Sequence, residues 1–99
     1  MTDLEIVRAC ADAMGLRAFQ HYRMKDCIEV SEDGTGRGAY LYNPLTSDEQ
    51  AMALVKRLEL RIGHGMAKPL DWFVESREAS ARHTDLNRAI VECVAKTQR

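Results

Sequence analysis

Three amphipathic segments, each opened by a helix start signal, constrain this chain more than any other feature. In residues 84–97, Thr84 is the expected N-cap, and apolar side chains then recur at three- and four-residue steps. Residues 2–5 form a capping box and predict a helix over residues 3–14, and residues 46–49 are a second such box. Each predicted helix has one apolar face, so the three helices are expected to enclose a shared interior.

Two-residue alternation predicts three short strands between these helices. Residues 27–30 and 39–42 flank a turn-rich loop and predict a hairpin, while residues 70–75 predict a third strand. The second helix is expected to reach Ile62, which extends its apolar stripe by a four-residue step, and to end at the glycines that follow. Residues 76–83 are polar and predict an irregular connection.

The resulting order, α-β-β-α-β-α, predicts a small α+β fold. Ninety-nine residues are enough for one core, so residues 1–99 are expected to form a single domain. The helices must cover a sheet to bury both sets of apolar side chains, which predicts a layered α/β sandwich with a three-stranded, mainly antiparallel sheet. Exposed sheet edges make a homodimer, or another homo-oligomer, one way to complete the fold.

Charge and hydropathy narrow the classes of partner and compartment. A formal net charge of −1 argues against nonspecific binding to nucleic acid or to a membrane surface. Residues 1–50 carry nine acids and five bases, a net of −4, whereas residues 51–99 carry six acids and nine bases, a net of +3. These halves could pair within the fold or across a head-to-tail dimer, but two oppositely charged faces that solvent screens are the favoured interpretation. The chain has no apolar run of about 20 residues and no secretory signal at its start, which predicts a cytoplasmic protein.

The motifs that could carry chemistry are few. Residues 34–38 are rich in glycine and include Arg37, but they lie between two predicted strands, so a hairpin turn is favoured over a phosphate cradle. His21, His64 and His83 lack the spacing of metal ligands. We therefore expect no catalytic, cofactor-binding or metal-binding residues.

The three cysteines show no C-x-x-C spacing, which is typical of free thiols in a reducing compartment. Cys10 and Cys93 fall on the predicted apolar helix faces and are expected to pack as small hydrophobic residues. Cys27 has the opposite parity to its apolar strand neighbours, and the sequence leaves open whether it is buried or exposed.

Four aromatic residues provide the candidate contacts with a partner. Tyr40 and Tyr42 share one parity, while Trp72 and Phe73 must lie on opposite faces of their strand. Aromatic side chains dominate the energetics of many protein interfaces. Together with Arg37, these four are the predicted partner-binding residues, with half-buried sheet packing as the alternative.

The chain resembles the phage α/β/α sandwich domain family of small bacteriophage and prophage proteins. Four passages carry the resemblance, namely residues 1–7, residues 42–47, Trp72 and residues 84–90. The glycine-rich hairpin and the small number of aromatic residues before the second helix depart from the family pattern. The resemblance implies a phage or prophage origin, a bacterial host cell and an accessory role, and it brings no catalytic residues.

The sequence and the resemblance together predict a non-catalytic protein that binds a host bacterial protein, for instance in counter-defence or host takeover. The alternative is a small-ligand or nucleotide-binding protein that uses the glycine-rich hairpin and Arg37. An enzyme is the third class, and no group of residues nominates its active site. Binding of nucleic acid is disfavoured by the net charge.

Overall fold

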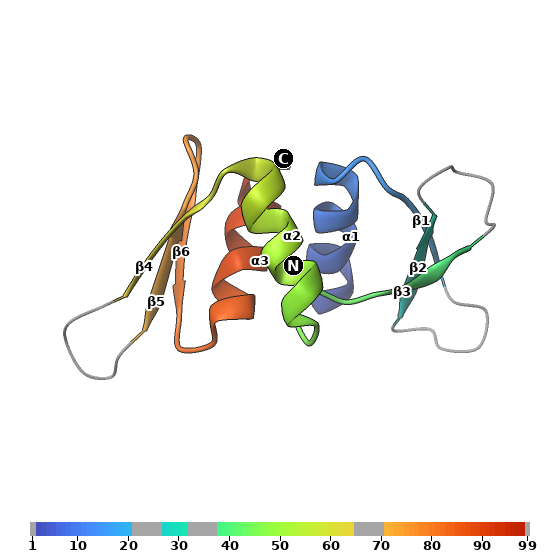
Figure 1. Cartoon of the computed structure of the whole chain (residues 1–99), viewed down its shortest axis with the longest axis horizontal. Helices are drawn as coiled ribbons and strands as arrows, with labels where there is room; N and C mark the ends of the chain where they lie inside the picture. The colour runs from blue at the N-terminus through green and yellow to red at the C-terminus, as the bar shows by residue number, and fades with distance from the viewer. Residues whose placement is uncertain (1, 21–26, 32–37, 65–70, 99) are drawn as a thin grey trace.

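Over its described residues, the protein folds into three helices and two three-stranded antiparallel sheets (Figure 1). The computed structural model describes residues 2–20, 27–31, 38–64 and 71–98. In chain order the elements are α1 (Asp3–Ala13), β1 (Arg17–Gln20), β2 (Ile28–Ser31), β3 (Tyr40–Tyr42), α2 (Asp48–Leu58), β4 (Arg61–His64), β5 (Trp72–Glu75), β6 (Ser80–His83) and α3 (Leu86–Thr97).

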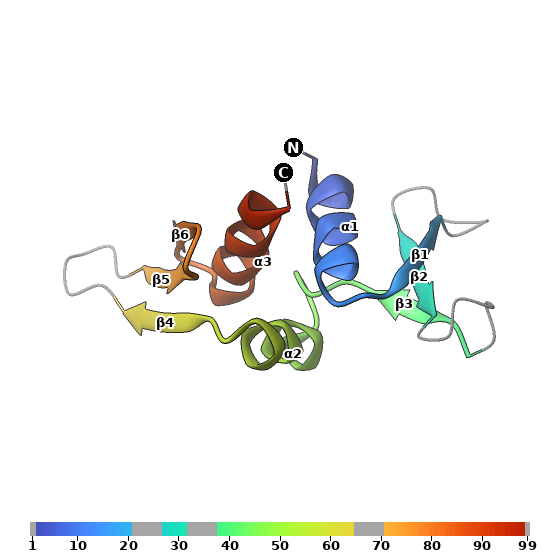
Figure 2. The same ribbon diagram turned by 90° about the horizontal axis from the view of Figure 1, so that it is seen from above.

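The helices form the middle of an elongated molecule, and the sheets form its two ends (Figure 1). The principal extents are 45 × 25 × 24 Å. The first sheet has the strand order β1-β2-β3 and packs against α1, whereas the second sheet has the order β4-β5-β6 and packs against α3. Figure 2 shows that β3, α2 and β4 follow one another along one long side of the molecule.

The α+β class predicted from the sequence is confirmed, but the number and order of the strands are corrected. The described ranges contain three further strands, β1, β4 and β6, and the strands within these ranges form two separate sheets instead of one. All three are edge strands, and they carry few buried apolar side chains, so their alternation is faint in the sequence. Residues 80–83, expected to be irregular, pair with β5 in an antiparallel register.

All three helices begin close to the predicted positions. The Thr2 hydroxyl accepts from the Glu5 backbone N–H at 3.2 Å, as the capping box predicts. The other two N-caps are Ser47 and Asp85, each one residue later than Thr46 and Thr84 at which the caps were expected. The Ser47 side chain accepts from the Gln50 backbone N–H, and the Asp85 side chain accepts from the Asn87 backbone N–H. These bonds satisfy N–H donors that have no partner within the first helical turn.

The second helix ends earlier than its apolar stripe predicts. Glu59 follows the last helical residue with φ 53° and ψ 48°, the left-handed conformation that usually belongs to glycine at this position. The Leu60 N–H then bonds the Val55 carbonyl at 3.0 Å and closes the helix. Ile62 therefore lies in β4, not on the helix.

The core is continuous from one sheet to the other through the contact between α1 and α3. Cys10 of α1 lies with its Sγ 3.8 Å from the carbonyl oxygen of Val91 in α3, and both residues are fully buried. On either side of this contact, Val30 in β2 and Val74 in β5 are also fully buried. The predicted apolar helix faces thus do share one interior, which also contains the inner faces of both sheets.

The starts of the three helices are tied together. Arg88 in the first turn of α3 forms an ion pair with Asp3 in the first turn of α1. The neighbouring Asn87 side chain donates to Asp48 at the start of α2, at 2.8 Å. These bonds hold three segments that are far apart in the sequence, and they place the N-terminus of each helix on the same part of the molecule.

Across the described residues, the structure contains no helix with the length and apolar character that a bilayer crossing requires.

Candidate functional site

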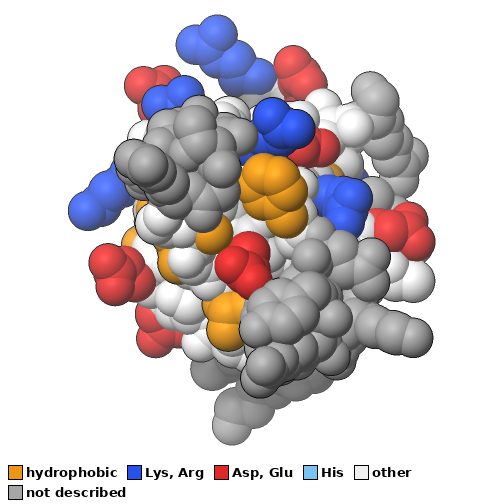
Figure 3. All heavy atoms as spheres, turned by 90° about the vertical axis from the view of Figure 1, so that its right-hand side faces the viewer, with side chains coloured by type: hydrophobic (Ala, Val, Ile, Leu, Met, Phe, Trp, Pro, Cys, Tyr) orange, Lys and Arg blue, Asp and Glu red, His pale blue; other side chains and the backbone are white. Residues whose placement is uncertain are grey.

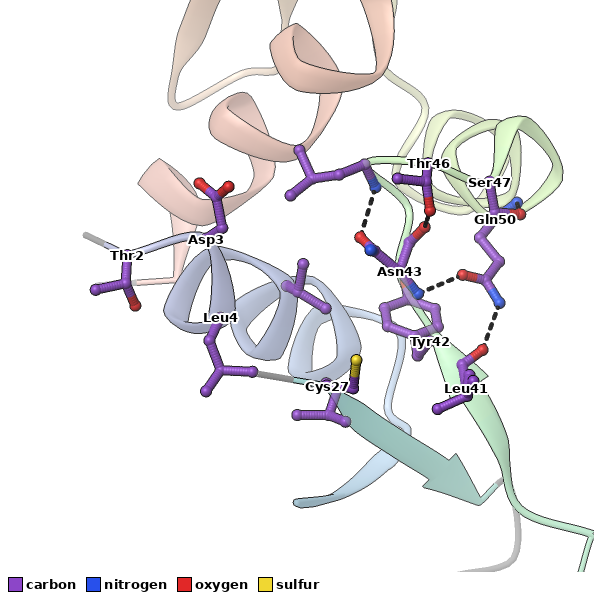
Figure 4. A pocket seen from close by; sticks show the side chains of 13 residues that line it. Thr2, Asp3, Leu4, Cys27, Leu41, Tyr42, Asn43, Thr46, Ser47 and Gln50 are labelled. Carbon is purple, nitrogen blue, oxygen red and sulfur yellow. Dashed lines mark hydrogen bonds between the residues drawn. The ribbon is translucent and has the colours of Figure 1, made fainter. Parts of the chain in front are cut away.

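A groove of about 740 Å³ lies between the start of α1, strands β2 and β3, and the turn that leads into α2 (Figure 4). The turn before α2 forms one wall of the groove. A side-chain hydrogen bond holds this turn, because the Asn43 side chain accepts from the Leu45 N–H at 3.2 Å. The residues that line the groove are Thr2, Asp3, Leu4, Val7, Cys27, Ile28, Leu41, Tyr42, Asn43, Leu45, Thr46, Ser47 and Gln50.

The groove combines an apolar floor with an uncharged polar rim. Leu4 and Val7 of α1 and Ile28 of β2 supply apolar surface below, while Leu41 of β3 stands at the rim with half of its surface exposed. Asp3 is the one charged residue of the lining within the described part of the chain, and it is already paired with Arg88. An apolar side chain of a partner would therefore meet matching surface without having to displace a bound charge.

A single side chain, that of Gln50, fixes the edge of β3 beside the groove. Its amide nitrogen donates to the Leu41 carbonyl at 3.0 Å, and its amide oxygen accepts from the Asn43 N–H at 2.6 Å (Figure 4). The Gln50 amide thus forms hydrogen bonds with the Leu41 carbonyl and the Asn43 N–H, two main-chain groups that a further β-strand at this edge would otherwise pair with. An edge strand covered in this way is protected from unintended pairing with other chains.

Tyr42 is the most deeply placed polar residue of the groove. Its side chain is 4% exposed, and its hydroxyl has no hydrogen-bond partner among the described residues. Burial raises the pKa of the Tyr42 hydroxyl well above its ordinary value, and the nearby Cys10 and Tyr40 raise it further. The hydroxyl therefore stays neutral at any physiological pH.

Of the five residues predicted to bind a partner, the four that the structure describes do not form one surface. Tyr40 and Tyr42 share the inner face of the first sheet by register, but Tyr40 is 39% exposed and Tyr42 is buried, so only Tyr40 offers a partner substantial surface. Trp72 and Phe73 lie in β5 at the other end of the molecule. Arg37 lies outside the described residues.

Trp72 and Phe73 occupy opposite faces of the second sheet, as alternation predicts. Trp72 packs against the core, with the His64 ring edge-on at a centroid distance of 4.6 Å. Phe73 faces outward beneath the Arg82 guanidinium, 5.2 Å from the ring centroid, in an attractive cation–π arrangement. Trp72 is therefore part of the packing, and Phe73 is the outward-facing aromatic residue of this strand.

The outer face of the first sheet repeats that arrangement with residues that sequence reasoning did not single out. The Arg17 guanidinium lies 5.4 Å from the centroid of the Phe19 ring, and Leu41 lies two strands away in the same row. Figure 3 shows this end of the molecule with hydrophobic side chains set between acidic and basic ones. Alternation within residues 17–20 was the available signal, but four residues with one large apolar side chain are too few to be recognised.

The thiols and imidazoles do not form a reactive cluster in the described residues. Burial raises the pKa of the Cys10 thiol to about 12, and burial is also the main reason that the pKa of Cys93 is raised. Cys27, whose environment the sequence left open, is partly exposed and lines the groove. Within the described ranges, no three His, Cys, Asp or Glu side chains are placed to hold a metal ion.

The histidines have structural surroundings where they are described. His83 accepts from the Asp85 N–H through Nδ1 at 3.0 Å, next to the start of α3, and His64 contacts Trp72. His21 lies outside the described residues, as does most of the glycine-rich hairpin. Of that hairpin, only Gly38 is described, with φ 66°.

Comparison with family models, with curated proteins and with solved structures gave no match to this chain.

Proposed function

We propose that this protein acts without catalysis by binding another protein, and that its groove receives an apolar side chain of that partner. The observation that carries the proposal is Leu41, which is half exposed at the rim of a cavity with an apolar floor. An apolar anchor that fills a pocket is a common centre of binding energy in protein interfaces. Burying Leu41 and the partly exposed Leu4 would remove apolar surface from water, which is worth roughly 25 cal/mol per Å².

The fixed geometry of the groove supports the same role. Gln50 and Asn43 hold the β3–α2 turn through side-chain hydrogen bonds, so the groove is formed before a partner arrives. A preformed site avoids part of the entropy cost of ordering loops on association. The rim also presents amide and hydroxyl groups, which can fix the orientation of a bound segment.

The identity of the partner rests on the family resemblance. The resemblance to phage α/β/α sandwich domains implies a protein of a phage or prophage, and hence a bacterial host protein as the target in a cytoplasmic setting. Counter-defence or redirection of a host process is the accessory role we propose for such an interaction.

The test is affinity capture from bacterial lysate with two matched variants. Leu41→Asp puts a charge at the rim of the groove, whereas Ile62→Asp puts the same charge on an apolar residue of β4, which is 36% exposed and outside the groove. We expect a specific host protein to bind the unaltered chain and the Ile62 variant, and to lose binding to the Leu41 variant. Equal capture by both variants, with both folded, would contradict the role of the groove.

A further inference from the structure

Side chains cover two of the four sheet edges in the described residues. Gln50 bonds main-chain groups at the β3 edge. At the β6 edge, the Lys96 ammonium donates to the Ser80 carbonyl at 2.8 Å. Each of these bonds uses main-chain groups that a further strand would pair with. Within the described residues, β4 has no such bond on its outer edge, which faces away from β5 and β6 (Figure 2).

The alternation of the antiparallel ladder shows which main-chain groups of β4 point outward. The Ser76 N–H bonds the Ala79 carbonyl at 2.8 Å and closes the β5–β6 turn, so the main chain of Glu75, in the next pair, points out of this hairpin. It therefore faces β4, where Glu75 pairs with Arg61. One residue further along β4, the N–H and C=O of Ile62 must point away from β5. Neither group has a hydrogen-bond partner among the described residues.

The side chains at this edge are apolar on one face and basic on the other. Ile62 lies on the inner face beside its buried partner Val74, but it is itself 36% exposed. Arg61 lies on the outer face with 85% of its side chain exposed, and its guanidinium is 3.8 Å from the Glu75 carboxylate. Residues 56–64 contain three bases and one acid, a net of +2. The other edge strand without a printed cover, β1, has no exposed large apolar side chain in its described part.

We infer that the β4 edge binds an extended segment of another protein in which acidic and apolar residues alternate. Addition of a strand to a sheet edge is a recurring mode of peptide recognition, in which main-chain bonds give affinity and alternate side chains give specificity. The segment would pair with the N–H and C=O of Ile62, cover the Ile62 side chain with apolar residues and place carboxylates beside Arg61. A guanidinium has five N–H donors, so Arg61 can bind a second carboxylate while it stays near Glu75.

A second copy of the chain fits this edge less well than an acidic segment. Strand β4 contains no acidic residue, so a pair of β4 strands would supply no carboxylate to either Arg61. The edge is also separate from the groove, because no residue of β4 belongs to the groove lining. The inference therefore stands apart from the role proposed for the groove.

The test uses two capped peptides of seven residues with the full chain. In one, glutamate alternates with valine, and in the other, lysine replaces each glutamate. We expect the acidic peptide to bind more tightly in calorimetry and to slow hydrogen exchange of the Ile62 amide, followed by NMR. Arg61→Glu should reverse the preference and weaken binding of the acidic peptide about fivefold, the effect of an exposed ion pair.

A proline at position 62 separates main-chain pairing from side-chain contact. Ile62→Pro removes the outward N–H but none of the bonds between β4 and β5, so the fold should persist while the acidic peptide no longer binds. Ile62→Ala keeps the N–H and is the matched control, which should still bind, though more weakly. Leu41→Asp, in the groove, should bind the acidic peptide as well as the unaltered chain does. Circular dichroism establishes that each variant is folded.

Several results would overturn the inference. They are equal binding of the two peptides or of neither, an Ile62 amide that exchanges equally fast with and without peptide, and equal binding to the folded Pro and Ala variants. Loss of binding in Leu41→Asp would place the peptide in the groove instead. An Ile62 amide that is protected without peptide, increasingly so at higher protein concentration, would assign the edge to a second copy. If Ile62→Pro does not fold, the reversal by Arg61→Glu and the Ile62 exchange rate decide.

Discussion

Arg88 and Asp3 form an ion pair across 85 positions of the sequence and join the first turn of α3 to the first turn of α1. The same guanidinium donates through Nε to Glu92 at 3.0 Å, one helical turn further along α3. These hydrogen bonds, first that to Asp3 and then that to Glu92, raise the pKa of Arg88 further above its already high ordinary value. Arg88 therefore remains charged and fixes the position of one helix on the other.

Replacing Arg88 with Gln should lower the free energy of unfolding by about 1 kcal/mol, because the pair is partly exposed and such pairs contribute modestly. Urea denaturation measures the change. A double-mutant cycle with Asp3→Asn should give a coupling energy for the pair, while Glu92→Gln alone should cost less. A coupling of zero would show that the pair contributes nothing to stability.

Glu59→Gly should stabilise the protein by roughly 0.5–1 kcal/mol, since Glu59 holds a left-handed conformation that carries a steric cost for any residue with a Cβ. Thermal denaturation measures the gain. A loss of stability would mean that the Glu59 side chain contributes more than its backbone conformation costs.

Gly15→Ala is expected to have the opposite effect, a loss of about 1 kcal/mol, at the same kind of position. Gly15 has φ 71°, and a Cβ built there meets no atom within 4 Å, so the loss would come from the backbone alone. Denaturation of this variant beside Glu59→Gly gives a matched pair, and a neutral result would show that the turn after α1 can change conformation.

The protein should lose stability progressively as the pH rises above 9. The Cys10 thiol has a pKa of about 12 when folded and 9.0 as the ordinary value, so between these values the unfolded chain releases a proton that the folded chain keeps. Stability is therefore fully present below pH 9.0 and falls as the pH approaches 12, with a slope of about 1.4 kcal/mol per pH unit for one group. Tyr42, whose pKa is also raised, adds to the loss above its ordinary pKa of 10.0.

Urea denaturation at a series of pH values measures this slope. Cys10→Ala should have a shallower slope and a lower stability at neutral pH, because it leaves a small cavity. A stability that is constant between pH 9 and 11 would contradict the burial of both groups.

Thiol labelling at pH 8 should distinguish the three cysteines. Cys27 is partly exposed and should react first, whereas Cys10 and Cys93 are buried with raised pKa values and should react only when the structure opens. Mass spectrometry of the labelled chain identifies the site, and labelling in denaturant gives the control in which all three react. Fast reaction of Cys10 in the native protein would contradict its position in the core.

The helices were predictable because their signals are local. The Thr2 cap, the apolar residues at four-residue steps and the Gly15 stop all lie within a few residues of the segment they describe. The end of α2 was missed for a physical reason, because Glu59 adopts the left-handed cap without the glycine that would announce it. Ile62 happens to continue the helical spacing of apolar residues, so the sequence predicted helix where the structure has β4.

The site was harder to predict because it depends on which segments meet. Nothing in the local pattern assigns Tyr40 and Trp72 to different sheets, since both lie in short alternating runs. The role of Gln50 depends on its distance to a strand that ends several residues earlier. Leu41 and Phe19 also become candidates for contact with a partner only once it is known which face of the first sheet packs on the core and which faces outward.

The contact of Cys10 with Val91 has a consequence for any partner long enough to touch both ends of the molecule. The two sheets share no strand, and each packs against its own helix. The orientation of one sheet's outer face relative to the other's is therefore set by the packing of α1 against α3. A change of side-chain volume at this buried junction would reorient both end faces at once. Recognition by such a partner could then be lost without altering a single residue that it touches.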